Sequence, residues 1–90
     1  MEKDSVEQIV KDHIVKEFLY DRPATVLDSR FPLVQEGVVD SLGIFRLIGF
    51  IENTFGIPVA PEDVVVENFA TVDAITSFIT GKLSAQSRRG

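Results

Sequence analysis

Apolar residues recur at helical spacing in three separate stretches of this chain, and this pattern restricts it to a helical fold more than any other feature. The first stretch covers roughly residues 5–19, the second residues 41–55, and the last begins after Thr71. Spacings of three and four residues place such side chains on one face of a helix, and that face has to be buried against another element. We therefore predict an all-α bundle.

Residues with strong end preferences bound these helices. Ser5 followed by Gln8 fits a capping box at the start of the first helix. Asp40 is the predicted N-cap of the second helix, and Gly56 suits the left-handed conformation that ends it. Thr71 is the predicted N-cap of the last helix.

The helical spacing also predicts which side chains face the core. They are Val6, Ile9, Val10 and Ile14 in the first helix, Ile44, Leu47, Ile48, Ile51 and Phe55 in the second, and Val72, Ile75, Phe78, Ile79 and Leu83 in the last. His13 shares the first of these faces, and we expect it at the edge of the core with a local hydrogen bond. A lone histidine without a partner motif is a poor candidate for catalysis.

Two connections complete the expected architecture of three longer helices and one short one. Residues 20–40 form a long first loop, because Pro23 and Pro32 interrupt any helix there. We expect this loop to be anchored to the core by Phe31, Leu33 and Val34. A short helix or turn is predicted over residues 61–67, with Pro61 at its first position.

Length and composition exclude several classes of protein. Ninety residues fit one domain, which we place at residues 1–83, followed by a disordered tail at 84–90. The absence of cysteine excludes disulfides and thiolate metal ligands, and a single histidine excludes a histidine-rich metal site. A net charge of −5 disfavours nucleic acid as a partner. No signal peptide or apolar run long enough for membrane insertion is seen. We expect a cytoplasmic monomer.

The second helix has a smaller apolar surface opposite its core face. Leu42, Phe45 and Gly49 lie there beside Arg46. Such a helix either packs on two sides or contacts a partner. Phe45 can lie under the long loop or face a partner, and the partner is favoured because Ser41 borders the same side.

Ser41 offers a hydroxyl at the start of the second helix, and two kinds of chemistry are open to it. A catalytic serine needs a base and an orienting group, but the single histidine is on the first helix and no G-x-S-x-G motif surrounds Ser41. The hydroxyl can instead be a modification site, where the helix start favours a phosphate group. The tripeptide D-S-L alone is typical of an ordinary helix N-cap.

The wider segment EGVVDSLGIFRLIGFIENTFGIPVAPEDVVVENFATVDAITSFI resembles the phosphopantetheine-binding acyl carrier family. The shared pattern is D-S-L opening the second helix, an apolar ladder, F-G-I closing it, a short helix rich in proline and acids, and T-V-x-A-I opening the last helix. The likeness spans roughly residues 4–80. It implies an acyl-carrier-like four-helix bundle.

The resemblance also implies a function. A phosphopantetheinyl transferase would attach 4′-phosphopantetheine from coenzyme A to Ser41, and the terminal thiol of this arm would hold cargo as a thioester. The protein would catalyse nothing itself. An acyl- or aminoacyl-loading ligase would charge it, and separate pathway enzymes would act on the cargo, so each contact has to be weak enough to release.

The charges of the second helix depart from the pattern of fatty-acid carriers, which usually have acids where this chain has Gly43 and Arg46. We therefore predict a dedicated carrier for a specialised lipid, polyketide-like or secondary-metabolite pathway. Its predicted partner-binding residues are Asp40, Leu42, Phe45, Arg46 and Glu52.

Two alternatives stay open at this point. The cargo can be an aminoacyl or peptidyl group, as in D-alanyl carriers. The chain can also be an unmodified helical interaction module in which Asp40 is only a cap. Gly43 and Gly49 each cost about 1 kcal/mol within a helix. This cost indicates that another group comes close to the second helix at these positions. The group can be a docking enzyme, the arm, its cargo or a neighbouring helix.

Overall fold

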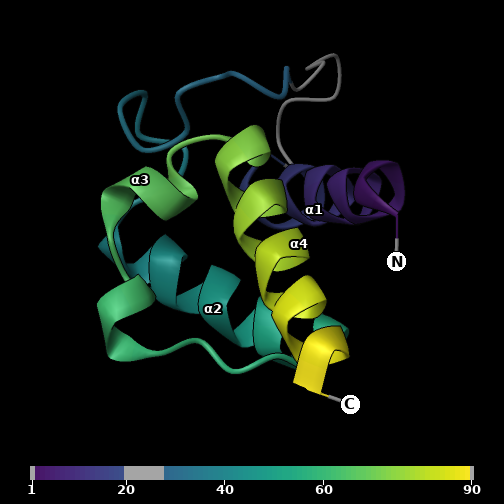
Figure 1. Cartoon of the computed structure of the whole chain (residues 1–90). Helices are drawn as coiled ribbons and strands as arrows, with labels where there is room; N and C mark the ends of the chain where they lie inside the picture. The colour runs from purple at the N-terminus through teal and green to yellow at the C-terminus, as the bar shows by residue number, and fades with distance from the viewer. Residues whose placement is uncertain (1, 20–27, 90) are drawn as a thin grey trace.

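The computed structural model describes residues 2–19 and 28–89, and all regular secondary structure in these ranges is helical. In Figure 1 the last helix contacts each of the other three α-helices. The predicted all-α four-helix bundle is thus confirmed. The elements are α1 (Lys3–Phe18), α2 (Ser41–Phe55), the 3₁₀ helix η1 (Pro61–Asp63), α3 (Val66–Phe69) and α4 (Val72–Arg89).

The core is made largely by the faces that the helical spacing predicts, but Ile9, predicted for the face of α1, is not among the residues that form it or pack against it. The fully buried members of the core include Val6, Val10 and Ile14 from α1, Leu47 and Ile51 from α2, and Val72, Ile75 and Ile79 from α4. The remaining residues of the predicted α2 and α4 faces are partly buried against this cluster. None of the helices in the described part of the chain is long and apolar enough to cross a membrane.

Three of the predicted helix ends are confirmed by their geometry. The Asp40 side chain accepts a hydrogen bond from the Gly43 amide at 2.8 Å, which caps α2. Gly56 ends α2 in the left-handed conformation, with φ of 65°. The Thr71 hydroxyl accepts a hydrogen bond from the Ala74 amide at 3.0 Å at the start of α4.

The predicted capping box of the first helix is wrong. Glu2 is the N-cap of α1, so Ser5 lies inside the helix, and the Gln8 side chain donates to Asp12 at 2.9 Å instead of reaching back. Nothing in the sequence before Ser5 stops a helix, and Asp4 in the first turn faces the positive end of the helix dipole.

The segment after α2 forms two short helices where one was predicted. Pro61 is the first residue of η1, as expected, but Val64 and Val65 separate η1 from α3. The Asp63 carboxylate accepts from the Ala60 amide at 3.0 Å and pairs with Lys82 of α4 at 2.8 Å, so it fixes η1 to the bundle.

At its other end α4 continues through Arg89, across most of the segment for which a disordered tail was predicted. No proline or glycine interrupts residues 82–89, so the helix has no local reason to stop.

The long connection is anchored at Leu33, as predicted. Its side chain is fully buried, and Phe31 and Val34 are partly buried beside it. The Leu33 amide donates to the Ala70 carbonyl at 2.8 Å, and the Leu33 carbonyl accepts from the Val38 amide at 2.9 Å. Pro23, the other residue invoked for this loop, lies outside the described residues.

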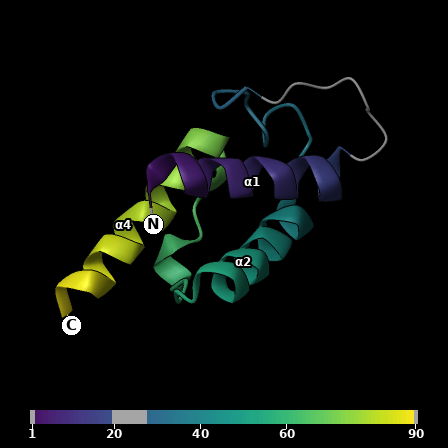
Figure 2. The same cartoon turned by 90° about the vertical axis from the view of Figure 1, so that its right-hand side faces the viewer.

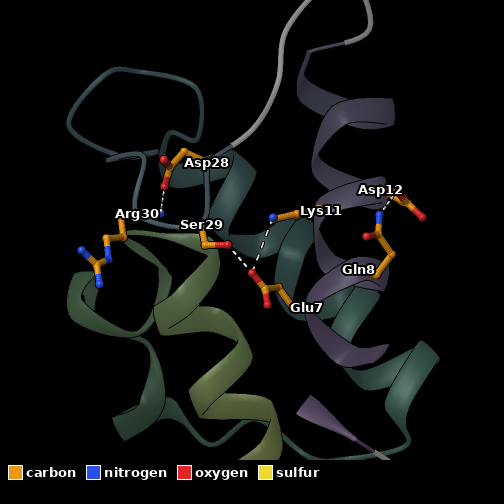
Figure 3. A network of polar contacts seen from close by, with 7 residues as sticks. All are labelled: Glu7, Gln8, Lys11, Asp12, Asp28, Ser29 and Arg30. Carbon is orange, nitrogen blue, oxygen red and sulfur yellow. Dashed lines mark hydrogen bonds and ion pairs between the residues drawn. The ribbon is translucent and has the colours of Figure 1, made fainter. Parts of the chain in front are cut away.

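Ser29 adds an anchor that the sequence pattern did not indicate. Figure 3 shows its hydroxyl directed at the Glu7 carboxylate of α1, which also pairs with Lys11 at 3.5 Å. The Ser29 carbonyl accepts from the Asp73 amide of α4 at 2.9 Å. One loop residue therefore connects α1 with the start of α4.

Candidate functional site

Ser41 is the first residue of α2, and its side chain is exposed to solvent. Figure 2 shows this end of α2 lying close to the C-terminal end of α1. Because Asp40 supplies the cap, the Ser41 hydroxyl is not needed to start the helix. The first amides of a helix have no acceptor within it, and the dipole is positive there, so the position favours an anionic group on the hydroxyl.

His13 cannot serve Ser41 as a catalytic base. Its ring stacks on Phe50 with the centroids 3.7 Å apart and the planes at 10°. Phe50 lies nine residues along α2 from Ser41, which corresponds to about 13 Å of helix rise. Burial lowers the pKa of His13 and keeps the imidazole neutral. The predicted local hydrogen bond is not formed at Nε2, which is buried and has no partner in the described part of the chain.

The second face of α2 is open to solvent. Leu42 is 73% exposed and Phe45 is 65% exposed, and Arg46 is exposed beside them. The interpretation that Phe45 lies under the long loop is therefore wrong. Two large apolar side chains this exposed on one helix are typical of a contact surface, although the role of this face stays a prediction.

The two glycines of α2 differ in their surroundings. A Cβ at Gly43 would lie 2.9 Å from Cε1 of Phe18 and 3.1 Å from the Val39 side chain. Gly43 is therefore explained by the packing of α2 against the end of α1. A Cβ at Gly49 would meet nothing within 4 Å, so nothing in the described chain requires a glycine there.

Two of the predicted partner-binding acids also have internal roles. The Asp40 carboxylate caps α2, and the Glu52 carboxylate accepts a hydrogen bond from the Val59 amide at 3.0 Å. Both side chains are nevertheless exposed. Their oxygens are therefore shared between the fold and the surface. The sequence predicted this double role for Asp40, whereas it gave Glu52 a surface role only.

A hollow of about 210 Å³ lies between the end of α1 and the start of α2, and we call it the α1–α2 hollow. Asp40 and Leu42, the two chain neighbours of Ser41, both line it. Sequence reasoning missed the hollow because it joins segments far apart in the chain. Its lining residues are Phe18, Val38, Asp40, Leu42, Gly43 and Arg46.

The described residues contain no cluster of three or more histidine, cysteine or acidic side chains able to hold a metal ion. The chemistry of this end of the molecule thus centres on one exposed hydroxyl at a helix start, next to a hollow and an apolar face.

Comparison with curated proteins gives two relatives that match nearly the whole chain. Probable acyl carrier protein PigG of Serratia sp. (strain ATCC 39006) is 32% identical over 79 residues, which is 88% of each chain. A D-alanyl carrier protein of Abiotrophia defectiva is 26% identical over 80 residues, which is 89% of each. No family model matches the chain.

Among solved structures, one similar chain belongs to a crystal structure described as that of an FAD-dependent dehydrogenase. The two chains align with a TM-score of 0.69 and 26% identity, over 78% of this chain and 97% of the other.

Proposed function

Because the chain belongs to the acyl carrier protein family, we propose that it carries acyl groups as thioesters on a 4′-phosphopantetheine arm attached to Ser41. The observation that carries the proposal is the exposed Ser41 hydroxyl at the start of α2, in a chain that aligns with a carrier over most of its length. When bound, the arm supplies the thiol that the sequence lacks.

The surroundings of Ser41 fit this group. In the attachment, the Ser41 oxygen forms a bond to a phosphorus of the coenzyme A pyrophosphate, a phosphodiester results, and the nucleotide part leaves. An external phosphopantetheinyl transferase removes the hydroxyl proton, because the single histidine of this chain is stacked on Phe50 and does not serve Ser41. Exposure of Ser41 gives the transferase access, and the helix start stabilises the phosphodiester anion.

The experiment is mass spectrometry of the intact protein after co-expression with a broad-specificity transferase. We expect an added phosphopantetheine group, located at Ser41 by fragmentation. Ser41→Ala should abolish the addition and keep the fold, because Asp40 supplies the cap. Ser5→Ala, at another exposed serine, is the control and should be modified like the wild type. If Ser41 stays unmodified while a second carrier in the same reaction is converted, the chain is an unmodified interaction module.

An aminoacyl cargo is a second candidate, favoured by the D-alanyl carrier among the relatives. The two cargoes differ in the loading enzyme. Incubation of the modified protein with acyl-activating and aminoacyl-activating ligases, followed by mass measurement, separates them. If an amino acid is transferred to the arm and no simple acid is, then the cargo is an aminoacyl group and the proposal of an acyl cargo is wrong.

We further propose that pathway enzymes dock on the exposed face of α2, through Leu42, Phe45 and Arg46 with Asp40 and Glu52 beside them. The exposure of the two apolar side chains supports this surface. The helix has one positive and one negative charge. A partner whose basic surface complements a strongly acidic helix would gain little binding energy from α2. The charge of α2 therefore favours dedicated partners in a specialised pathway.

A flavin-dependent dehydrogenase is one class of partner to assay. The crystal structure described as that of an FAD-dependent dehydrogenase contains a chain similar to this one. Part of this 90-residue chain covers 97% of that chain, so that chain is also small. We propose that the protein works as a cytoplasmic monomer that meets such enzymes one at a time.

A further inference from the structure

The α1–α2 hollow combines apolar walls with one acceptor and one donor. Phe18 and Val38 are partly buried and form apolar wall on the side of α1 and the loop, while Leu42 is 73% exposed on the side of α2. At about 30 Å³ for each water, the hollow holds several waters or one small branched organic group. A group with methyls directed at these walls would remove apolar surface from water.

The polar side chains that line the hollow keep groups that can bind a ligand. Oδ1 of Asp40 accepts from the Gly43 amide, which leaves its second oxygen for another donor. Arg46 forms no ion pair within residues 2–19 and 28–89. The hollow therefore presents a carboxylate oxygen and a guanidinium group to whatever enters it.

We propose that the α1–α2 hollow binds the first part of the arm, its pantoyl unit, when no enzyme is docked. This inference rests on the proposed attachment at Ser41. The pantoyl unit has two methyl groups on one carbon, a neighbouring hydroxyl, and a phosphodiester on its other side. The methyls contact Phe18 and Leu42, the hydroxyl donates to Asp40, and Arg46 pairs with the phosphodiester.

The position of Ser41 in the chain makes this site reachable. Both of its chain neighbours, Asp40 and Leu42, line the hollow, so a group attached to Ser41 starts one residue along the chain from that lining. Gly43 is also part of the lining, and a side chain there would collide with the Phe18 ring. The glycine thus keeps the Phe18 wall and the hollow in place.

The test is NMR spectroscopy of isotope-labelled protein before and after modification, once mass spectrometry has shown complete loading. We expect nuclear Overhauser contacts from the pantoyl methyls to the Phe18 ring and the Leu42 methyls. Arg46→Gln should reduce these contacts and move the methyl signals toward their positions in free coenzyme A. Arg30→Gln removes an exposed arginine that does not line the hollow, and should leave the contacts unchanged.

The outcomes separate this inference from the proposed function. A loaded protein whose pantoyl signals match free coenzyme A overturns the inference and leaves the carrier function intact. Contacts to Val64–Val66, the exposed apolar residues around the start of α3, overturn it in the same way. Failure to load Ser41, beside a carrier that is converted, overturns both proposals.

Discussion

At the residue scale, Gly43 and Gly49 carry the same helix penalty for different reasons. Gly43 has the Phe18 ring over it, so a methyl group has no room. Gly49 has open space around it, so the chain itself has no use for the missing side chain. A glycine that costs helix stability without an internal reason is consistent with the close approach of another molecule.

Alanine at these two sites should therefore change stability in opposite directions. Gly49→Ala should raise the free energy of unfolding by up to about 1 kcal/mol, because alanine favours the helix. Gly43→Ala should lower it by about 1–3 kcal/mol, because its methyl displaces Phe18. Urea unfolding of the matched pair measures both. A stable Gly43→Ala variant would contradict the packing that defines the α1–α2 hollow.

Thr76 gives a second prediction at this scale. Its side chain is fully buried on α4, and its hydroxyl has no hydrogen-bond partner in the described chain. Thr76→Val replaces an unpaired polar group with a methyl of similar shape, and should raise the free energy of unfolding by about 1 kcal/mol. Thr80→Val is the control, since that hydroxyl donates to the Ser77 carbonyl at 3.2 Å. Equal effects at both sites would contradict the prediction.

At the scale of elements, the contact of the long connection with α1 should depend on pH. The hydrogen bond from Ser29, with help from Lys11, lowers the pKa of Glu7 below its usual 4.5. The unfolded chain then binds a proton more readily, so this contribution is present above pH 4.5 and is lost as pH falls through the folded pKa.

Glu7→Gln and Ser29→Ala should both weaken the loss of stability in acid, as measured by urea unfolding on either side of pH 4.5. The pKa of Asp63 is also lowered, by the hydrogen bond from Lys82, so Asp63 too contributes stability that is lost in acid. Part of the pH dependence should therefore remain in both variants. A Glu7→Gln variant with the full wild-type dependence would show that the Ser29 contact is unimportant in solution.

The aromatic contact between α1 and α2 should respond to pH nearer neutrality. The imidazole of His13 lies on Phe50, and burial lowers its pKa below 6.5. The charged groups that act on it are Glu17, which raises the pKa, and Lys16, which lowers it, and neither reverses the effect of burial.

Stability due to this contact is complete above pH 6.5 and falls as pH is lowered through the folded pKa. His13→Phe should keep the stack and remove this dependence, which thermal unfolding between neutral and mildly acidic pH will measure. Persistence of the dependence in His13→Phe would assign it to another group.

These elements also show what a sequence can predict here. Local signals predicted α2 with both its ends, the Thr71 cap of α4 and the place of Ser41 at the start of α2, because each depends on a few neighbouring residues. The stack of His13 on Phe50 and the Ser29 contact were missed, because they join residues distant in the chain. Ser5 failed as a cap because an equally permissible helix starts earlier.

At the scale of the whole molecule, the exposed face of α2 should matter for encounters with enzymes and little for folding. Phe45→Ala should change the free energy of unfolding by less than about 0.5 kcal/mol, since the side chain is 65% exposed. It should slow transfer of cargo to the pathway enzymes, and so should Arg46→Glu.

Val66→Ala is the matched control for Phe45→Ala, because Val66 is also exposed but lies on α3. Initial rates of transfer at low carrier concentration, with circular dichroism to check folding, provide the measurement. Unchanged rates in Phe45→Ala, or an equal loss in Val66→Ala, would place the docking surface elsewhere.

Leu42 and Arg46 belong to two surfaces, since they line the hollow and also stand on the exposed face of α2. A side chain that holds the arm is not free to hold an enzyme. The proposed resting state and the proposed docking of enzymes are therefore competing states, in which the tethered arm would compete at a high effective concentration. Under these two proposals each enzyme has to displace the arm, so we expect an enzyme that binds the carrier also to release the arm into its own active site.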